Sequence, residues 1–176
     1  MILKIDDRFP GVDDSKKLDA AKREKLAVAI KARAIAWGVG VVEPEVIDRI
    51  NLHWAGILAM RRAVDALAIA PDCVLIDARH LRSLLVPHQA IVGGDGKSAS
   101  IAAASIIAKT TRDALMVQLD AQYPGYGFAI HKGYPVPEHR DAIRRLGVVP
   151  IHRRSFAPVR AALGLALVQP DDDEAD

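Results

Sequence analysis

The sequence has few aromatic residues, a single cysteine and no long uncharged apolar run. Aromatic residues make up 5% of the 176 residues, so a core has to be built from Ala, Val, Ile and Leu. The lone Cys73 excludes an internal disulfide framework and fits a reducing compartment. The longest uncharged apolar stretch, residues 98–108, is too short to cross a bilayer, and no secretory signal is visible. We therefore expect a soluble, cytoplasmic protein without a membrane partner.

The overall composition is that of one globular domain, with 51% hydrophobic and 26% charged residues. We expect this domain to cover residues 1–160, followed by a helix end and an acidic tail over residues 161–176. The net charge of +2 includes five acids among the last six residues, so the rest of the chain carries +7. A basic body of this kind suits a polyanionic partner.

Apolar runs and helical periodicities alternate along the chain, with no repeat or linker. Asp19 is placed to cap the first helix, and a break in the second is expected near Asn51. We expect residues 123–137 to be largely loop. The expected helices cover residues 20–37, 45–70, 98–119, 137–146 and 156–167, and the expected strands cover residues 38–43, 73–76 and 90–92. This alternation predicts an α/β fold in which helices pack against a mixed sheet.

Two aspartates follow two of the expected strands. Asp77 closes the run Val74-Leu-Ile-Asp77, and Asp95 lies in a glycine-rich turn between a strand and a helix. Ligands of α/β sheets tend to bind beyond the carboxyl ends of strands, and a carboxylate pair there suits a hard cation such as Mg²⁺. For each aspartate alone, a helix cap or a surface turn is an equal or stronger explanation.

The turn that carries Asp95 also partly matches a phosphate-binding loop, because Lys97 and Ser98 follow a glycine-rich turn and precede the next helix. That motif needs a glycine five residues before Gly96, and Ile91 stands there instead. A nucleotide-binding protein is therefore an alternative that the motif supports only in part.

Aromatic, glycine and basic residues are interleaved over residues 123–134, including Lys132 and Tyr134. Such a segment suits stacking on bases or sugars and contact with phosphates, although a packed loop anchored by its tyrosines is an equal explanation. Several arginines between residues 140 and 154 are candidates for a phosphate-binding face. The six histidines show no metal-ligand spacing, which argues against a structural zinc site.

Ten short motifs, in order between residues 12 and 159, resemble those of bacterial ribonuclease HII. They are Asp14-Ser-Lys-Lys-Leu18, Ile47-Asp-Arg-Ile-Asn51, Ala59-Met60, Leu75-Ile-Asp77, Gly94-Asp-Gly-Lys-Ser98, Ser100-Ile-Ala-Ala-Ala-Ser-Ile-Ile-Ala-Lys109, Thr111-Arg-Asp113, Tyr123-Pro-Gly-Tyr-Gly-Phe128, His131-Lys-Gly-Tyr134 and Ile151-His-Arg-Arg-Ser-Phe-Ala-Pro158. The resemblance implies a ribonuclease H-like fold. It also implies an endonuclease that cuts the RNA strand of RNA/DNA hybrids and cuts at ribonucleotides embedded in DNA.

The resemblance also implies site residues and a cofactor. In the family, four acidic residues hold two Mg²⁺ or Mn²⁺ ions, and Asp77 and Asp95 match the third and fourth. One ion activates the attacking water and the other stabilises the leaving 3′ oxygen, which gives 3′-hydroxyl and 5′-phosphate products. Tyr134 matches a tyrosine that stacks on the sugar at the RNA–DNA junction. The other residues expected to contact the nucleic acid are Lys16, Lys17, Asn51, Lys97, Ser98 and Lys132.

The sequence departs from the family pattern at its start and at two single positions, residues 78 and 93. The family's opening Asp-Glu-Ala-Gly-Arg-Gly motif, which supplies the first two acids, is absent, and Met1-Ile-Leu3 resembles the end of the family's second strand. Gly93 stands where a lysine is usual, and Ala78 where a glycine is usual. We therefore expect a ribonuclease H-like domain without its first strand, monomeric and of low activity. A non-catalytic protein that binds RNA/DNA hybrids is the first alternative.

Overall fold

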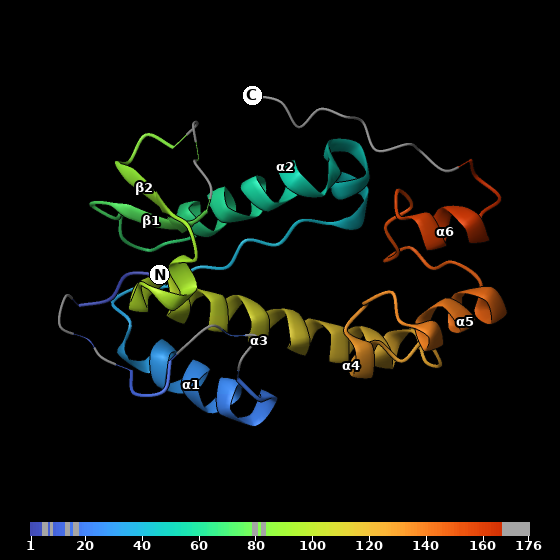
Figure 1. Ribbon diagram of the computed structural model, residues 1–176, viewed down its shortest axis with the longest axis horizontal. Helices are drawn as coiled ribbons and strands as arrows, with labels where there is room; N and C mark the ends of the chain where they lie inside the picture. The colour runs from blue at the N-terminus through green and yellow to red at the C-terminus, as the bar shows by residue number, and fades with distance from the viewer. Residues whose placement is uncertain are drawn as a thin grey trace. The chain divides into compact units, whose positions relative to one another are not determined.

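The computed structural model describes residues 1–4, 7, 9–12, 15, 18–78, 81 and 84–166. Helices precede and follow a parallel pair of strands in the described part of the chain, and this combination of helices and strands confirms the predicted α/β class (Figure 1). The chain forms two compact units, one of residues 1–41 and 56–114 and the other of residues 42–55 and 115–176. In chain order the elements are α1 (Ala20–Arg33), α2 (Pro44–Asp65), β1 (Val74–Asp77), β2 (His88–Ile91), the 3-10 turn η1 (Gly94–Gly96), α3 (Ala99–Gln122), α4 (Phe128–His131), α5 (Pro137–Leu146) and α6 (Ala157–Ala162).

The first unit contains a parallel pair of strands, β1 and β2, in which Val74 pairs with His88 and Asp77 with Ile91. The amides of Val74 and Ala78 donate to the carbonyls of Pro87 and Ile91, at 2.9 and 3.0 Å. Because parallel strands end at the same edge, the residues that follow β1 and β2 are brought together there. This edge carries the candidate site.

The core of the first unit lies between α1 and the first half of α3. Ile30, Ala103 and Ile106 are fully buried in it, together with Phe9 and Ala27. Asp19 caps α1 by accepting a hydrogen bond from the Lys22 amide at 2.8 Å, which confirms the predicted cap.

The strand predicted over residues 38–43 is wrong. No ladder is formed there in the part of the chain that the structure describes, and the nearest pairing is an isolated antiparallel bridge between Ile2 and Ala36. The segment instead packs against the backbone of α2. A Cβ atom on Gly40 would lie 1.9 Å from the Ala59 carbonyl oxygen, and one on Gly38 would lie 2.6 Å from that of Ala63. The glycines therefore serve a close approach of two backbones.

Three of the predicted helices, over residues 20–37, 45–70 and 156–167, extend too far at their C-terminal ends. α1 ends at Arg33 because Ala34 turns to an extended conformation that leads into the bridge with Ile2. α2 ends at Asp65, and α6 ends at Ala162. The break at Asn51 is confirmed by its φ of 62° and ψ of 172°. Residues 167–176, which include the predicted acidic tail, lie outside the described residues, and the predicted boundary at residue 160 stays a prediction.

The second unit is built from the end of α3 and from α4, α5 and α6. α5 has the predicted bounds, whereas the expected loop over residues 123–137 contains the short helix α4. The core of the second unit includes Tyr126, Phe128 and Ile143, and the rings of Tyr126 and Phe128 stack with centroids 5.3 Å apart. Asp48, near the start of α2, contacts the turn before α6, because its carboxylate accepts the amides of Arg154 and Ser155 at 2.7 and 2.8 Å. No described helix is long and apolar enough to span a membrane.

Replacing Gly40 by alanine is expected to destabilise the protein by about 2 kcal/mol or more, because the new methyl group meets backbone atoms of α2 that cannot turn aside. Urea unfolding followed by circular dichroism measures the change. Gly56→Ala is the matched control, since nothing lies within 4 Å of its Cβ position and alanine favours the helix. Equal stability of the two variants would contradict the close approach.

Candidate active site

Asp77 and Asp95 come together at the shared edge of β1 and β2. Asp77 is the last residue of β1, and Asp95 lies in η1, directly after β2. The Asp77 carboxylate accepts a hydrogen bond from the Gly94 amide at 2.8 Å, which ties the end of one strand to the turn that follows the other. A Cβ at Gly94 would lie 2.5 Å from Cδ1 of Ile101, so a side chain at this position would displace the end of the Ile101 side chain. The two predicted aspartates are therefore neighbours in the fold.

Both aspartates line a cavity of about 370 Å³ in the first unit. They are the only acidic residues among its lining residues, and the rest of the wall is mostly apolar, from residues 37–40, α2, β1 and α3. Asp77 is exposed and Asp95 is half-buried. The partial burial of Asp95 against an apolar wall strengthens its electrostatic contacts, whereas water screens the exposed Asp77.

The left-handed conformation next to Asp77 is held by an alanine. Ala78 has a φ of 56°, a region that glycine adopts at little cost and that alanine adopts at about 1 kcal/mol. The Ala78 amide donates to Ile91, so the strained residue is part of the strand pairing. The left-handed backbone suits the glycine that the resemblance leads us to expect at this position.

Lys97 and Ser98 lie beside Asp95, and their polar groups serve the local turn. The Lys97 ammonium donates to the Val92 carbonyl at 2.7 Å, and the Ser98 hydroxyl accepts the Ile101 amide at 3.5 Å. Lys97 is exposed, so its ammonium can exchange this contact for a phosphate.

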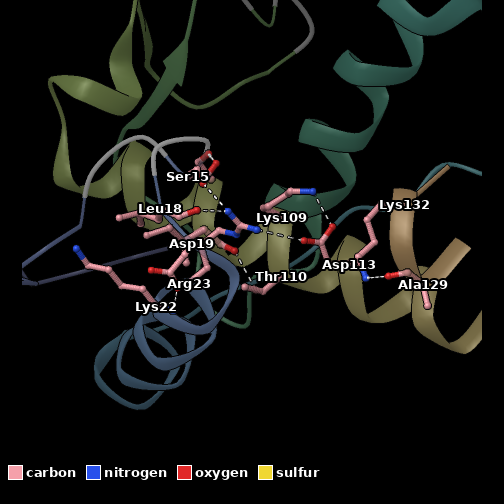
Figure 2. Close-up of polar contacts among 12 residues, drawn as sticks. Ser15, Leu18, Asp19, Lys22, Arg23, Lys109, Thr110, Asp113, Ala129 and Lys132 are labelled. Atoms are coloured by element: carbon pink, nitrogen blue, oxygen red, sulfur yellow. Dashed lines mark hydrogen bonds and ion pairs between the residues drawn. The ribbon is translucent and has the colours of Figure 1, made fainter. Parts of the chain in front are cut away.

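Lys132 and Tyr134 lie in the second unit, directly after α4. Lys132 ends α4 in a left-handed conformation with a φ of 52°, and its ammonium donates to the Ala129 carbonyl at 2.7 Å (Figure 2). The side chain of Tyr134 is 54% exposed. Asn51 lies at the break in α2 and accepts the Trp54 amide at 3.1 Å, so it caps the second half of that helix. Lys16 and Lys17 lie outside the described residues.

A charged network that sequence reasoning missed fixes the residues on either side of Lys16 and Lys17. The Arg23 guanidinium donates to the carbonyls of Ser15, at 3.0 Å, and Leu18 (Figure 2). It also faces the Asp113 carboxylate at 3.7 Å, which receives Lys109 at 2.7 Å. The spacing of Lys109 and Asp113 on one helix face was a signal for their pairing, but nothing in the sequence joined them to Arg23.

The acidic groups at the strand edge fit one divalent cation better than two. Mg²⁺ in phosphate chemistry is commonly held by one or two carboxylates plus phosphate oxygens and water, and Asp77 and Asp95 supply such a pair. One Asp77 oxygen already accepts the Gly94 amide. No group of three or more His, Cys, Asp or Glu side chains that could hold a metal ion is found among the described residues.

Comparison with solved structures defines the class of protein. The chain is similar to the crystal structure of the ribonuclease H2 from Pyrococcus horikoshii OT3, with a TM-score of 0.73 and 27% sequence identity over 86% of this chain and 80% of that chain. The fold is therefore that of the ribonuclease H2 class of α/β proteins, as predicted. The family model of Ribonuclease HII matches residues 7–159. This chain belongs to the Ribonuclease HII family.

Curated relatives support the same assignment. The chain is 62% identical over 164 residues to a Ribonuclease HII of Myxococcus xanthus (strain DK1622), covering 93% of this chain and 56% of the relative. It is 60% identical over 168 residues to a Ribonuclease HII of Anaeromyxobacter sp. (strain Fw109-5), covering 96% of this chain and 53% of the relative. The chain thus spans about half the length of these relatives.

Replacing Ala78 by glycine is expected to stabilise the protein by about 0.5 kcal/mol, because the left-handed backbone no longer strains a side chain while the unfolded chain gains freedom. Ala34→Gly is the control, since Ala34 has a φ of −60° and should lose about 0.5–1 kcal/mol. Urea midpoints of the two variants give the comparison. A loss of stability in both would show that Ala78 carries no strain.

Proposed function

We propose that this protein is an endoribonuclease that hydrolyses the RNA strand of RNA/DNA hybrids and cuts DNA at embedded ribonucleotides. Family membership supports the reaction class, and the single observation that carries the site is the juxtaposition of Asp77 and Asp95 at the edge of the two parallel strands. Their carboxylates would hold Mg²⁺ or Mn²⁺ beside the scissile phosphate. A bound divalent cation supplies an acidified water and charge stabilisation for the leaving 3′ oxygen, and two ions would share these tasks.

The chain's own residues have separate tasks in this proposal. Asp77, oriented by the Gly94 amide, would offer its second oxygen to the cation, and Asp95 lines the same cavity. Lys97 and Ser98 would contact the phosphate that follows, Lys132 would contact the nucleic acid, and Tyr134 would stack on the sugar at the RNA–DNA junction. Lys16, Lys17 and Asn51 contact the backbone elsewhere along the duplex, through charge and hydrogen bonding.

The chain by itself should be a weak enzyme. Two carboxylates neutralise one divalent cation and leave a second with few protein ligands, and the described residues bring no third acid to this edge. We therefore propose that cation binding depends on the phosphate of the substrate. The lack of a third acid also favours the second candidate, a protein that binds RNA/DNA hybrids with salt-sensitive affinity and does not cut them.

The first test measures cleavage of a DNA duplex that contains one ribonucleotide, in Mg²⁺ and in Mn²⁺. We expect slow cutting at the ribonucleotide, with 3′-hydroxyl and 5′-phosphate ends, and a loss of about 100-fold or more in kcat/KM for Asp77→Asn or Asp95→Asn. Asp72→Asn is the control, because this exposed aspartate precedes β1 and does not line the cavity.

The candidate functions give different outcomes. Binding of the duplex without cutting, unchanged in both active-site variants, would favour the hybrid-binding protein. Cutting that survives both substitutions would rule out the two aspartates as the cation ligands. Affinity measured across a salt series gives the number of phosphate contacts in either case.

Tyr134→Ala should reduce the preference for the ribonucleotide-containing duplex over an all-DNA duplex by about tenfold, because stacking of one aromatic ring is lost. Ile130→Ala is the matched control, since Ile130 is 86% exposed and lies in α4 of the same segment. Competition binding with the two labelled duplexes measures the ratio. An unchanged ratio in Tyr134→Ala would remove this residue from the interface.

We also propose a cytoplasmic monomer that acts in DNA replication and repair, where hybrids and embedded ribonucleotides arise. The free thiol of Cys73 is exposed, as suits a reducing compartment. A basic body is expected to favour duplex nucleic acid as the partner over other proteins.

A further inference from the structure

Three histidines that are scattered in the sequence gather in the second unit. The imidazole rings of His131 and His139 stack with centroids 4.3 Å apart, and those of His139 and His152 lie 5.4 Å apart. His139 and His152 are both 6% exposed and pack against the buried ring of Phe128. None of these histidines belongs to the cation site described above.

The hydrogen bonds fix the tautomer of each buried ring. The Val149 amide donates to Nδ1 of His152 at 3.0 Å, so the proton of this neutral ring is on Nε2. Nε2 of His152 lies 3.2 Å from Nε2 of His139, which must accept this proton, so the His139 proton is on Nδ1. Nδ1 of His139 then donates to the Tyr134 carbonyl at 2.9 Å. All four ring nitrogens are satisfied when both rings are neutral.

This chain of bonds ends on the residue that we place at the sugar. The Tyr134 carbonyl also accepts the Val136 amide at 2.9 Å, and the Tyr134 amide donates to the His131 carbonyl at 2.9 Å. His131 in turn accepts the Gly133 amide on Nδ1 and donates from Nε2 to the Tyr126 carbonyl at 2.7 Å. The main chain around Tyr134 is therefore held by imidazoles on both sides.

We propose that His139, backed by His152, is a positioning residue that sets the main chain of Tyr134 and thereby the orientation of its ring toward the RNA–DNA junction. This inference rests on the proposed function for its substrate, and on the geometry of the histidine pair for its mechanism. Both imidazoles are buried, so we assign them no direct contact with nucleic acid.

The same geometry makes the arrangement sensitive to acid. A proton added to either imidazole brings two N–H groups face to face between the Nε2 atoms, or displaces the Val149 amide, and so breaks the chain of bonds. The other titratable or charged groups that act on His139 are His131 and Arg153, and Tyr126 packs against His152. No carboxylate is among the causes that act on either ring.

The pKa values support the neutral state. Burial lowers the pKa of His152 to about 4, and the adjacent His139 adds to this shift. Burial also lowers the pKa of His139, with His131 and Arg153 adding to the shift and the bond to Tyr134 opposing it. Because the folded pKa values lie below the ordinary value of 6.5, the unfolded chain binds more protons under acidic conditions. The contribution of the pair is complete above pH 6.5 and declines as the pH falls toward 4.

Two substitutions of His139 separate positioning from packing. Asparagine places its amide nitrogen near the position of Nδ1, so His139→Asn keeps a donor for the Tyr134 carbonyl and loses the contact with His152. Glutamine reaches the position of Nε2, so His139→Gln keeps an acceptor for His152 and loses the donor to Tyr134. Both replace one ring by one amide of similar polarity.

The first measurement is the preference for the ribonucleotide-containing duplex over the all-DNA duplex at pH 7.5. His139→Gln should lose about fivefold of this preference, as for one lost hydrogen bond, and His139→Asn should retain it. His88→Gln, in the first unit, is the control. Equal losses in both His139 variants would reduce the residue to a packing role, and an unchanged preference in His139→Gln would overturn the proposal.

The second measurement does not depend on nucleic acid. With fluorotyrosine incorporated, the chain gives three ¹⁹F signals, and Tyr134→Phe identifies one of them. At pH 6.5, where the fluorinated phenol is protonated, we expect the Tyr134 signal to shift in His139→Gln and not in His139→Asn. In the unsubstituted protein the signal should change as the pH falls from 6.5 toward 4. A Tyr134 signal that is the same in His139→Gln as in the unsubstituted protein would overturn the proposal. If the protein shows no duplex preference while these shifts occur, the proposed substrate is wrong and the positioning role stands.

Discussion

The hydrogen bond from the Gly94 amide to the Asp77 carboxylate is the interaction on which the candidate active site depends. It joins the end of β1 to the turn after β2, and so it decides where Asp95 lies relative to Asp77. The parallel pairing of the strands brings the two segments to one edge, and this bond orients the Asp77 carboxylate there. A side chain at Gly94 would meet the end of the Ile101 side chain, which would have to move to make room for it.

Other glycines of the first unit also lie where a Cβ would meet a neighbouring segment. Gly38 and Gly40 let the chain cross α2 at backbone contact, and the segment gives up strand pairing to do so. Ala78 shows the opposite case, in which a residue with a side chain takes a left-handed conformation beside the site. Strand pairing and packing thus set the backbone geometry around Asp77. At Ala78 they hold a left-handed conformation that a residue with a side chain disfavours.

In the second unit, the imidazole rings of His139 and His152 are buried. Each of the rings of His139 and His152 makes two hydrogen bonds, and burial next to Phe128 keeps them neutral. An exposed aromatic residue, Tyr134, follows a short helix and has its main chain fixed by these buried rings. A buried polar network thereby gives a surface residue a defined backbone.

The sequence by itself determined the α/β class, the cap at Asp19, the break at Asn51, the bounds of α5 and the pairing of two aspartates with two strand ends. These follow from local periodicity, from turn and cap residues, and from motifs whose order is visible along the chain. The strand predicted over residues 38–43 was wrong, because apolar composition alone cannot tell a strand from an extended segment packed on a helix.

Tertiary structure alone decided which distant groups meet. Arg23 reaches Asp113 across ninety residues of chain, and His139 meets His152, because each pair is carried by elements whose packing brings them together. No local pattern marks such contacts, since they depend on how whole helices and turns are placed within a unit. The histidines looked scattered in the sequence for this reason, and became one network only when the second unit folded.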